Sequence, residues 1–357
     1  MKILFIYPEI SSKSGGGVLT NTIRDTLLKI TSDLVEYHFP LYMSSFQKLK
    51  NQLSLHTMGM TKHLEDDIIN KIKQELPDIV IINSSRIGCL CKRIKCQFPE
   101  IKVITIFHNV ELKFVFDGFK SNKNIFSLLT ILATWYNERL AIKYSDDIVA
   151  LNDRDAKTLQ RVYCRPVNFI MPLCLNDRFD FSKVVEKKSD DPVMGAFIGS
   201  NFYANNRGIK WFCENVSNKI NYTILIIGKG FENEAEYFSH FPNIKLIGTV
   251  NDIDSFYYNI DFVVSPIFDG SGMKTKTAEA LMFGKTIFGT TEAFEGYEVP
   301  IDKIGKLCNS ADEFISTINS YDRNLLGGFN KYSRSIFLQK YSDDILVEIL
   351  NKIIKND

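Results

Sequence analysis

The segment between residues 269 and 285 has residue types and spacing that suit the binding of an anion. An apolar run at 261–265 predicts a strand, which leads through a glycine-broken loop into a helix predicted over about 273–283. A helix N-terminus presents unpaired N–H groups and favours negative charge, and glycine lets a phosphate approach the backbone closely. The backbone N–H groups expected to face such a ligand are those of Gly270, Ser271, Gly272, Met273 and Lys274.

Glu279 is predicted to lie between one and two turns into this helix, and an apolar run at 286–289 predicts the next strand. A carboxylate at this place could accept two hydrogen bonds from a vicinal diol such as a ribose. Together with the glycine loop before it, Glu279 indicates a nucleotide-diphosphate site.

This segment resembles the donor-binding signature of GT-B glycosyltransferases, in the retaining family 4 and its relatives. The match is to the variant G-S-G-M-K-x-K-x-x-E-A-L-x-x-G-K, which spans residues 270–285 here. The better-known branch carries a first glutamate eight residues before the second, where this chain has Ser271. The resemblance implies that Glu279 holds the donor ribose, while the loop amides face the sugar and the diphosphate.

Other segments fit the same family and follow its order along most of the chain. They are 108–111, 151–155, 197–200 followed by Asn205 and Asn206, and 226–230. The resemblance implies an α/β fold of the GT-B type. This fold has two Rossmann-like domains with parallel sheets facing a central cleft, and a C-terminal helix that crosses back to the first domain.

Alternating strand-like runs and helical patterns independently predict a parallel sheet in each half of the chain. The strand candidates are 2–7, 34–39, 78–83, 102–107, 147–151 and 167–171 in the first half, and 194–198, 223–227, 245–247, 261–265 and 286–289 in the second. Helical patterns in the first half cover 19–30, 64–75, 87–98, 126–144 and 153–163.

The chain length of 357 residues exceeds what one core usually supports, so two domains are expected. A segment rich in Asp and Lys without a sustained apolar period predicts the linker between them. The expected division is an acceptor-binding domain over 1–175, a linker over 176–192, a nucleotide-sugar-binding domain over 193–340, and a C-terminal helix over 341–357 that packs on the first domain.

Composition is that of a globular protein, with 45% apolar and 24% charged residues. A net charge of +1 gives no general attraction to nucleic acid. The seven cysteines show no paired metal spacing, so reduced cysteines in a cytosolic protein are expected. The apolar run at 1–7 is too short for a signal peptide or a membrane span. We therefore expect a cytoplasmic protein that binds no nucleic acid.

Ligands of open α/β sheets bind outside the carboxyl ends of the strands, so the residues that follow predicted strands are candidates. Gly16 and Gly17 belong to a triple glycine after the first strand, and Gly199, Gly228 and Val250 follow strands of the second half. In the family, the first loop lies near the donor sugar and the acceptor, and the backbone near Val250 contacts the nucleobase. A flexible turn is the alternative for the triple glycine.

His108 and Glu111 follow a predicted strand of the first half. In similar enzymes a histidine in this region hydrogen-bonds the transferring sugar, and a purely structural histidine is the alternative. Glu111 could orient His108, bind the acceptor or act as a base, and the sequence does not choose among these roles.

Release of a diphosphate requires positive charge nearby, which metal-independent enzymes supply from their own side chains. The candidates are Arg207, Lys210, Lys229 and Lys274, with a solvated side chain as the alternative for each. Lys274 has the best local argument because it flanks the glycine loop at a helix N-terminus. No Asp-x-Asp pair stands in a setting that would hold Mg²⁺, so no metal is expected, and no cofactor beyond the donor substrate.

The first domain also contains a candidate membrane-facing surface. Its basic residues are Arg86, Lys92, Arg93 and Lys95, and its interleaved basic and aromatic residues are Lys113, Phe114, Phe116, Phe119, Lys120 and Lys123. We expect 113–123 to be an acceptor-side loop, followed by an apolar stretch at 125–133. Such a surface could contact an anionic inner membrane from the cytoplasmic side. A core helix with basic flanks is the alternative for 125–133.

Taken with the resemblance, these residues predict a glycosyltransferase of the hexosyltransferase type, retaining and metal-independent. It would move a sugar from a nucleotide-diphosphate donor to a glycan or lipid-linked acceptor in bacterial surface polysaccharide synthesis, such as capsule or lipopolysaccharide. Two alternatives stay open: a sugar-nucleotide epimerase on the same fold, which needs no acceptor, and a non-catalytic GT-B partner subunit.

Overall fold

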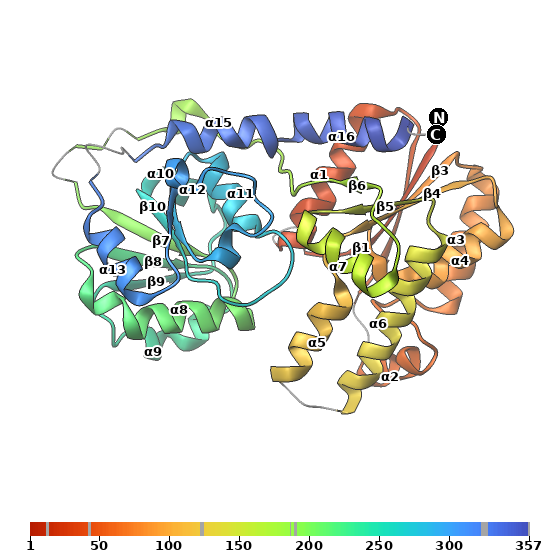
Figure 1. The fold of residues 1–357 in the computed structure, drawn as a ribbon, viewed down its shortest axis with the longest axis horizontal. Helices are drawn as coiled ribbons and strands as arrows, with labels where there is room; N and C mark the ends of the chain where they lie inside the picture. The colour runs from red at the N-terminus through yellow and green to blue at the C-terminus, as the bar shows by residue number, and fades with distance from the viewer. Residues whose placement is uncertain are drawn as a thin grey trace. The chain divides into compact units, whose positions relative to one another are not determined.

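The computed structural model describes residues 1–11, 14–41, 44–121, 125–185, 187–188, 191–322 and 328–355. The chain divides into two compact units, coloured mainly red to yellow and green to blue in Figure 1. Unit 1 comprises Met1–Pro172 and Leu346–Asp357, and unit 2 comprises Leu173–Ile345. Each unit is built on one six-stranded sheet.

The sheet of unit 1 has the strand order β2-β1-β3-β4-β5-β6, and all neighbouring strands are parallel. Its strands are β1 (Ile3–Glu9), β2 (Leu34–Pro40), β3 (Ile79–Ile82), β4 (Lys102–Phe107), β5 (Asp147–Ala150) and β6 (Phe169–Ile170). Its helices are α1 (Gly15–Ile30), α2 (Ser45–Leu53), α3 (Lys62–Glu75), α4 (Gly88–Gln97), α5 (Glu111–Ser121), α6 (Ile125–Tyr144) and α7 (Asp153–Tyr163). Every residue of β3 and β5 is buried, as a parallel sheet covered by helices requires.

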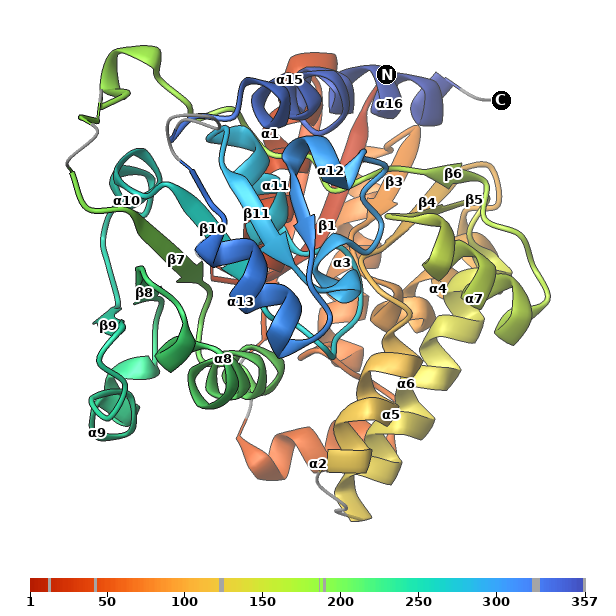
Figure 2. The same ribbon diagram turned by 60° about the vertical axis from the view of Figure 1, so that its left-hand side comes forward.

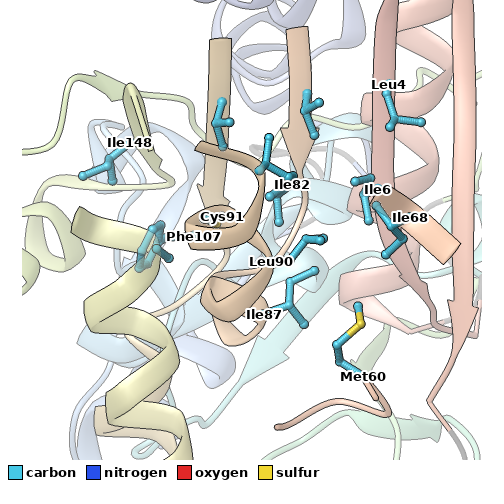
Figure 3. Close-up of a cluster of buried hydrophobic side chains, with 14 of the residues drawn as sticks. Leu4, Ile6, Met60, Ile68, Ile82, Ile87, Leu90, Cys91, Phe107 and Ile148 are labelled. Carbon is cyan, nitrogen blue, oxygen red and sulfur yellow. The ribbon is translucent and has the colours of Figure 1, made fainter. Parts of the chain in front are cut away.

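A cluster of buried apolar side chains fixes this sheet to its helices (Figure 3). Leu4 and Ile6 come from β1, Ile82 from β3, Leu90 from α4 and Phe107 from β4, and all are fully buried. Burying one such side chain contributes about 1.5–3 kcal/mol relative to leaving it in water. The cluster therefore holds the carboxyl ends of β3 and β4 in place, where the polar residues of the site begin.

The sheet of unit 2 has the order β12-β11-β10-β7-β8-β9 and is also parallel. Its strands are β7 (Met194–Ile198), β8 (Thr223–Ile227), β9 (Ile244–Gly248), β10 (Phe262–Ser265), β11 (Thr286–Gly289) and β12 (Gly305–Leu307). Its helices, seen from a second side in Figure 2, are α8 (Tyr203–Asn215), α9 (Ala235–Phe238), α10 (Asp254–Asn259), α11 (Thr275–Met282), α12 (Ile301–Ile304), α13 (Ala311–Asn319) and α15 (Lys331–Lys340).

The predicted fold class is confirmed, and each strand predicted from an apolar run is present. Strand β12 was not predicted, because this edge strand is only three residues long and has no apolar run. Helix α2 was not predicted either. The segment 113–123 was predicted to be a loop, but its described residues are helical as far as Ser121. Helix α5 forms because Glu138 of α6 accepts hydrogen bonds from the backbone N–H groups of Glu111 and Leu112 in its first turn.

The triple glycine also differs from its prediction as a loop before a helix, because α1 already begins at Gly15. Ser14 caps the helix, and its hydroxyl accepts a hydrogen bond from the N–H of Gly17 at 3.2 Å. Gly16 and Gly17 therefore belong to the first helical turn.

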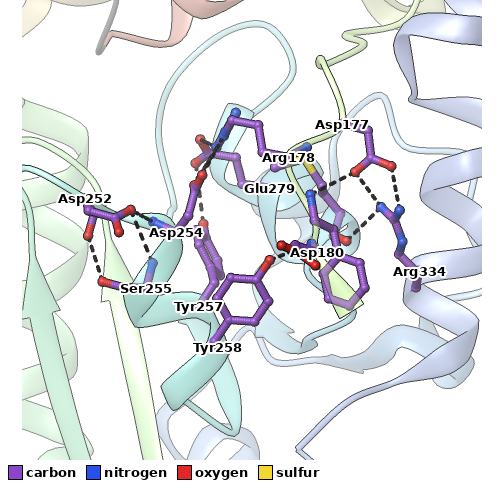
Figure 4. Close-up of polar contacts among 12 residues, drawn as sticks. Asp177, Arg178, Asp180, Asp252, Asp254, Ser255, Tyr257, Tyr258, Glu279 and Arg334 are labelled. Carbon is purple, nitrogen blue, oxygen red and sulfur yellow. Dashed lines mark hydrogen bonds and ion pairs between the residues drawn. The ribbon is translucent and has the colours of Figure 1, made fainter. Parts of the chain in front are cut away.

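The segment expected to be a linker packs on unit 2 in its described residues. Phe179 stacks on Phe329 with ring centroids 5.3 Å apart, and the N–H of Asp180 donates to the Tyr258 hydroxyl at 2.7 Å. Asp177 accepts hydrogen bonds from Arg334 (Figure 4). Aromatic residues within this Asp- and Lys-rich stretch thus anchor it to the domain that follows.

The last helix, α16 (Asp343–Lys355), begins in unit 2 and belongs to unit 1 from Leu346 onward. Lys102 of β4 donates a hydrogen bond to the carbonyl of Ile353 at 3.2 Å. The predicted return of the C-terminal helix to the first domain is therefore present.

Candidate functional site

The glycine loop of unit 2 connects β10 to α11, as the sequence predicted. Gly272 has a φ of 65°, in the left-handed region that favours glycine. In the part of the chain that the structure describes, the backbone N–H groups of Gly270, Gly272 and Met273 have no hydrogen-bond acceptor. The first turn of α11 contains no acidic residue, and Lys274 provides no side-chain cap. The loop and helix end therefore offer a set of donors to an anion.

Three contacts from other segments of unit 2 hold this loop. The hydroxyl of Tyr297 donates to the carbonyl of Lys274 at 2.7 Å, and Thr277 donates to the carbonyl of Ala293 at 2.7 Å. Buried Met273 accepts a hydrogen bond from the N–H of Leu173 through its Sδ at 3.3 Å. The loop is thus fixed at its helical end, which orients the amides before a ligand arrives.

Gly199 and Gly228 lie side by side at the carboxyl ends of β7 and β8. A Cβ at Gly228 would lie 1.9 Å from the Gly199 carbonyl oxygen, so no side chain fits there. The N–H of Gly228 in turn donates to the carbonyl of Gly248 at 2.7 Å. This part of the sheet edge consequently presents backbone to a ligand.

Val250 lies in the loop after β9, close to a carboxylate that organises the neighbouring backbone. Glu232 accepts hydrogen bonds from the N–H of Thr249 and, at 2.7 Å, from the N–H of Gly230. A hydrogen bond with the Thr249 side chain, followed by those from backbone N–H groups, lowers the pKa of the Glu232 carboxyl to about 2. Glu232 is therefore a fixed negative charge that joins the loops after β8 and β9.

Glu279 takes part in a polar network within unit 2 (Figure 4). It accepts hydrogen bonds from Arg178 at 3.2 Å and from the Tyr257 hydroxyl at 3.4 Å, and Arg178 also binds Asp254 at 3.1 Å. The Glu279 side chain is 14% exposed. Burial raises the pKa of its carboxyl above the ordinary value, and the Arg178 guanidinium opposes that rise. Each carboxylate oxygen can still accept another hydrogen bond, so Glu279 keeps acceptor capacity for a ligand hydroxyl.

Two of the four predicted cations of unit 2, Lys274 and Arg207, face carboxylates beside the glycine loop. Lys274 pairs with Glu292 at 2.8 Å and donates to the carbonyl of Gly272 at 2.8 Å. Arg207, which is 72% exposed, pairs with Asp269 at 2.6 Å, directly before the glycine loop. The structure therefore brings both cations to the loop, each with its charge matched by an acid.

Sequence reasoning missed Lys276, which lies in the first turn of α11. Its Nζ donates to the side-chain oxygen of Asn205 at 2.7 Å and lies 4.5 Å from the centre of the Phe197 ring. Burial, together with the charge of Lys274, lowers the pKa of Lys276 to about 7. Its place in the K-x-K of the signature was the one signal available in the sequence.

In unit 1 the structure joins Gly16 to His108 through a chain of hydrogen bonds. Thr20 of α1 donates its hydroxyl proton to the carbonyl of Gly16 at 2.8 Å and accepts from the Asn83 amide at 2.9 Å. Asn83 must therefore turn its Oδ1 toward His108, whose Nε2 lies 2.7 Å away. Nε2 consequently carries the proton, which leaves Nδ1 as an acceptor.

Burial lowers the pKa of His108 to about 4, so the imidazole is neutral at physiological pH. A neutral ring with Nδ1 as acceptor suits a hydrogen bond from a ligand hydroxyl better than it suits general acid catalysis. Asn83 ends the predicted strand 78–83, but no role was predicted for it or for Thr20.

Glu111 lies at the start of α5, where its carboxylate is near Asn109 at 3.2 Å and Arg86 at 3.8 Å. Among the described residues it has no hydrogen bond to His108. A second carboxyl next to Glu111, that of Glu138, is buried. Burial raises the pKa of Glu138 to about 7. Glu138 therefore positions this loop, a role that only the folded structure shows.

The described residues include no group of three or more His, Cys, Asp or Glu side chains placed to hold a metal ion. Within the same described ranges, no helix is both long and apolar enough to cross a bilayer.

Residues 193–321 match a family model described as glycosyl transferases group 1. This stretch includes the glycine loop, Glu279 and the sheet edge that carries Gly199 and Gly228. No curated protein matches the chain.

Several solved structures share the fold of the whole chain. Sucrose-phosphate synthase (tll1590) from Thermosynechococcus elongatus has a TM-score of 0.78 at 10% identity, over 99% of this chain and 98% of that one. WaaG, a glycosyltransferase involved in lipopolysaccharide biosynthesis, has a TM-score of 0.71 at 15% identity, over 99% and 100%. Anabaena Alr3699/HepE in complex with UDP has a TM-score of 0.70 at 12% identity, over 100% of both chains. At such identities the likeness establishes the fold, which is GT-B.

Proposed function

We propose that this chain is a glycosyltransferase that moves a sugar from a nucleotide-diphosphate donor to a glycan or lipid-linked acceptor. The observation that carries the proposal is the coincidence of two findings within residues 193–321. The family model for glycosyl transferases covers the same stretch in which unpaired loop amides, a helix N-terminus and Glu279 lie together. A structure of HepE contains UDP, which supports a nucleotide donor for a chain of this fold.

In this proposal Glu279 accepts hydrogen bonds from the donor ribose, and the loop amides contact the diphosphate. Arg178 and Tyr257 hold the Glu279 carboxylate in one orientation. Gly199, Gly228 and the backbone at Val250 border the nucleotide, because ligands of open α/β sheets bind at the carboxyl ends of strands.

The resemblance to family 4 favours transfer with retention of the anomeric configuration and without a metal ion or other cofactor. Retention by departure and attack on one face needs no strong base. A neutral His108 that accepts a hydrogen bond through Nδ1 agrees with such a route, because it would bind the sugar and transfer no proton. Arg207 and Lys274 would add positive charge near the diphosphate.

The acceptor belongs, in this proposal, to a bacterial surface polysaccharide such as capsule or lipopolysaccharide. Similar folds occur in WaaG and in the lipopolysaccharide outer core galactosyltransferase WaaB. A lipid-linked acceptor would require unit 1 to touch the cytoplasmic face of the inner membrane.

Exposed apolar side chains on three contacting helices of unit 1 support such a membrane contact. They are Phe46 and Leu53 on α2, Phe116 on α5, and Leu128 and Leu132 on α6, with exposures of 46–78%. The basic residues at 86–95 contribute less to this membrane contact, because two of them are paired with acids. Arg93 pairs with Glu65 and Asp66, and Lys95 pairs with Asp146. Lys123 and the side chain of Lys120 lie outside the described residues.

Sedimentation with anionic vesicles tests this contact, and Phe46→Asp should reduce the bound fraction. Equal binding of wild type and variant would exclude this surface.

A two-stage assay tests the enzymatic proposal. Thermal shifts with UDP-, GDP-, dTDP- and CMP-sugars identify the donor, because a ligand of the native state raises its stability. The donor is then incubated with protein alone and with acceptor extracts. Transfer that depends on an acceptor supports the proposal, while conversion of the donor alone would identify an epimerase. Absence of any shift with all donors would contradict a donor site.

A further inference from the structure

Among the described residues, Lys276 differs from Lys274, Arg207 and Lys210 in having no acidic partner. Lys274, Arg207 and Lys210 each form an ion pair with a carboxylate. Among the described residues, Lys276 pairs with no acid, and its Nζ donates only to the neutral oxygen of Asn205. An ammonium has three N–H donors, so two remain for a ligand.

The position of Lys276 is the one where a diphosphate is expected. It lies in the first turn of α11, next to the unpaired amides of the glycine loop. A Cβ built on Gly199 would lie 2.9 Å from its Nζ, so the ammonium lies directly against the end of β7. A side chain at position 199 would compete with the ammonium for this space.

The local electrostatics of Lys276 are unfavourable in the absence of an anion. A cation in the first turn opposes the helix dipole, and Lys274 adds a second positive charge nearby. The acid that acts on Lys276 is Glu279 from the same helix, whereas α8 and β7 present only neutral Asn205 and Phe197 to it. The lowered pKa of Lys276 agrees with this excess of positive charge. A bound diphosphate would neutralise the excess.

We propose that Lys276 is the side chain that binds the donor diphosphate, with Asn205 orienting its ammonium. This inference rests on the proposed function, since it assigns a residue of the same donor site. Lys274, held by Glu292 and by the Gly272 carbonyl, then stabilises the loop and is not the main phosphate contact.

Isothermal titration calorimetry at pH 8 tests the assignment with UDP, GDP, ADP and dTDP and with their nucleosides. Phosphates are fully ionised at this pH, because their second pKa is about 6. Lys276→Met should weaken binding of the preferred diphosphate by about 10- to 100-fold and change nucleoside affinity by less than about 2-fold. Lys276→Arg keeps the charge and should stay within about 5-fold of wild type. Lys245→Met, at the exposed residue of β9, is the control and should bind as wild type does.

Proton uptake supplies a second readout that a purely structural lysine would not change. A lysine with a pKa of about 7 is mostly neutral at pH 8 and becomes charged when the diphosphate binds. Binding enthalpies in buffers of different ionisation enthalpy should show uptake of about half a proton or more by wild type. Both Lys276 variants should show none.

The outcomes separate this inference from the proposed function. Diphosphate binding that survives Lys276→Met unchanged would overturn the role of Lys276 and leave the donor site intact. Equal loss of nucleoside and diphosphate affinity would also overturn it, because the residue would then be structural. If wild type bound none of the four diphosphates, the donor site and the role of Lys276 would both be wrong.

Discussion

Replacing Arg178 by methionine should destabilise unit 2, and more so at high pH. Arg178 hydrogen-bonds Asp254 at 3.1–3.2 Å and Glu279 at 3.2 Å. Arg178, Asp254 and Glu279 are 32%, 27% and 14% exposed, so solvent screens them less than a surface pair and more than a buried one. Hydrogen bonds to charged groups contribute about 1.5–3 kcal/mol, and exposed ion pairs about 0–1 kcal/mol. We expect the free energy of unfolding to fall by about 2–3 kcal/mol at pH 8.

The pH dependence follows from the pKa of Glu279. Burial raises this pKa in the folded protein, and removal of Arg178 lets it rise further. Between the ordinary glutamate pKa of about 4.3 and the raised folded value, the folded state binds a proton that the unfolded state lacks. Stability of Arg178→Met therefore falls as the pH rises through this interval. The destabilisation should therefore be smaller at pH 5 than at pH 8.

Urea unfolding followed by the fluorescence of Trp211 measures the effect. Trp211 lies in unit 2, with its ring 4.6 Å from that of Phe268, and Trp135→Phe removes the other tryptophan from every variant. Arg178→Lys is the matched control and should recover part of the stability. Adding Glu279→Gln to Arg178→Met should abolish the pH dependence. A loss below about 0.5 kcal/mol at pH 8, or an equal loss at both pH values, would refute this account of the network.

Four further predictions concern the two candidate sites. Glu279→Ala should weaken nucleoside diphosphate binding by about 1.5–3 kcal/mol without unfolding the protein, and unchanged affinity in calorimetry would remove Glu279 from the site. Transfer activity should survive EDTA, whereas a complete loss restored by Mg²⁺ or Mn²⁺ would refute metal independence. His108→Ala should lower turnover far more than nucleotide affinity, and an inverted product configuration would recast His108 or Glu111 as a base. Burial raises the pKa of Glu138 to about 7, so its contribution to stability should decrease as the pH rises from about 4.5 to 7. Urea unfolding measured across this pH range should therefore show a flatter pH dependence of stability for Glu138→Gln. A pH dependence equal to that of wild type would contradict this prediction.

The fold was predictable because its signals are local. Buried strands such as β3 and β5 are short apolar runs, and the glycine loop before α11 is punctuated by glycines at fixed spacing. Such patterns depend on neighbours in the sequence and not on distant contacts. The same reasoning failed for α5, whose first turn is stabilised by Glu138 from the following helix.

The partners within each candidate site were not predictable, because they come from distant segments. Arg178 lies 101 residues from Glu279 in the sequence, in a stretch whose composition suggested a linker. Asn205 and Lys276 meet only because β7 and β10 are neighbours in the sheet. Lys274 showed the reverse: its local setting suggested a phosphate contact, yet Glu292 faces it from the loop after β11.

The hydrogen-bond chain from Gly16 to His108 has a consequence for the interpretation of sequence variants. Every proton along it has one allowed position, so the tautomer of the imidazole depends on the hydroxyl of Thr20 in α1. A change of Thr20 to valine keeps the shape of the side chain but frees the Asn83 amide to rotate, which would let either ring nitrogen carry the proton. In a mutational scan, position 20 should therefore group with the residues of the proposed sugar site. A screen based on distance to a ligand would overlook it.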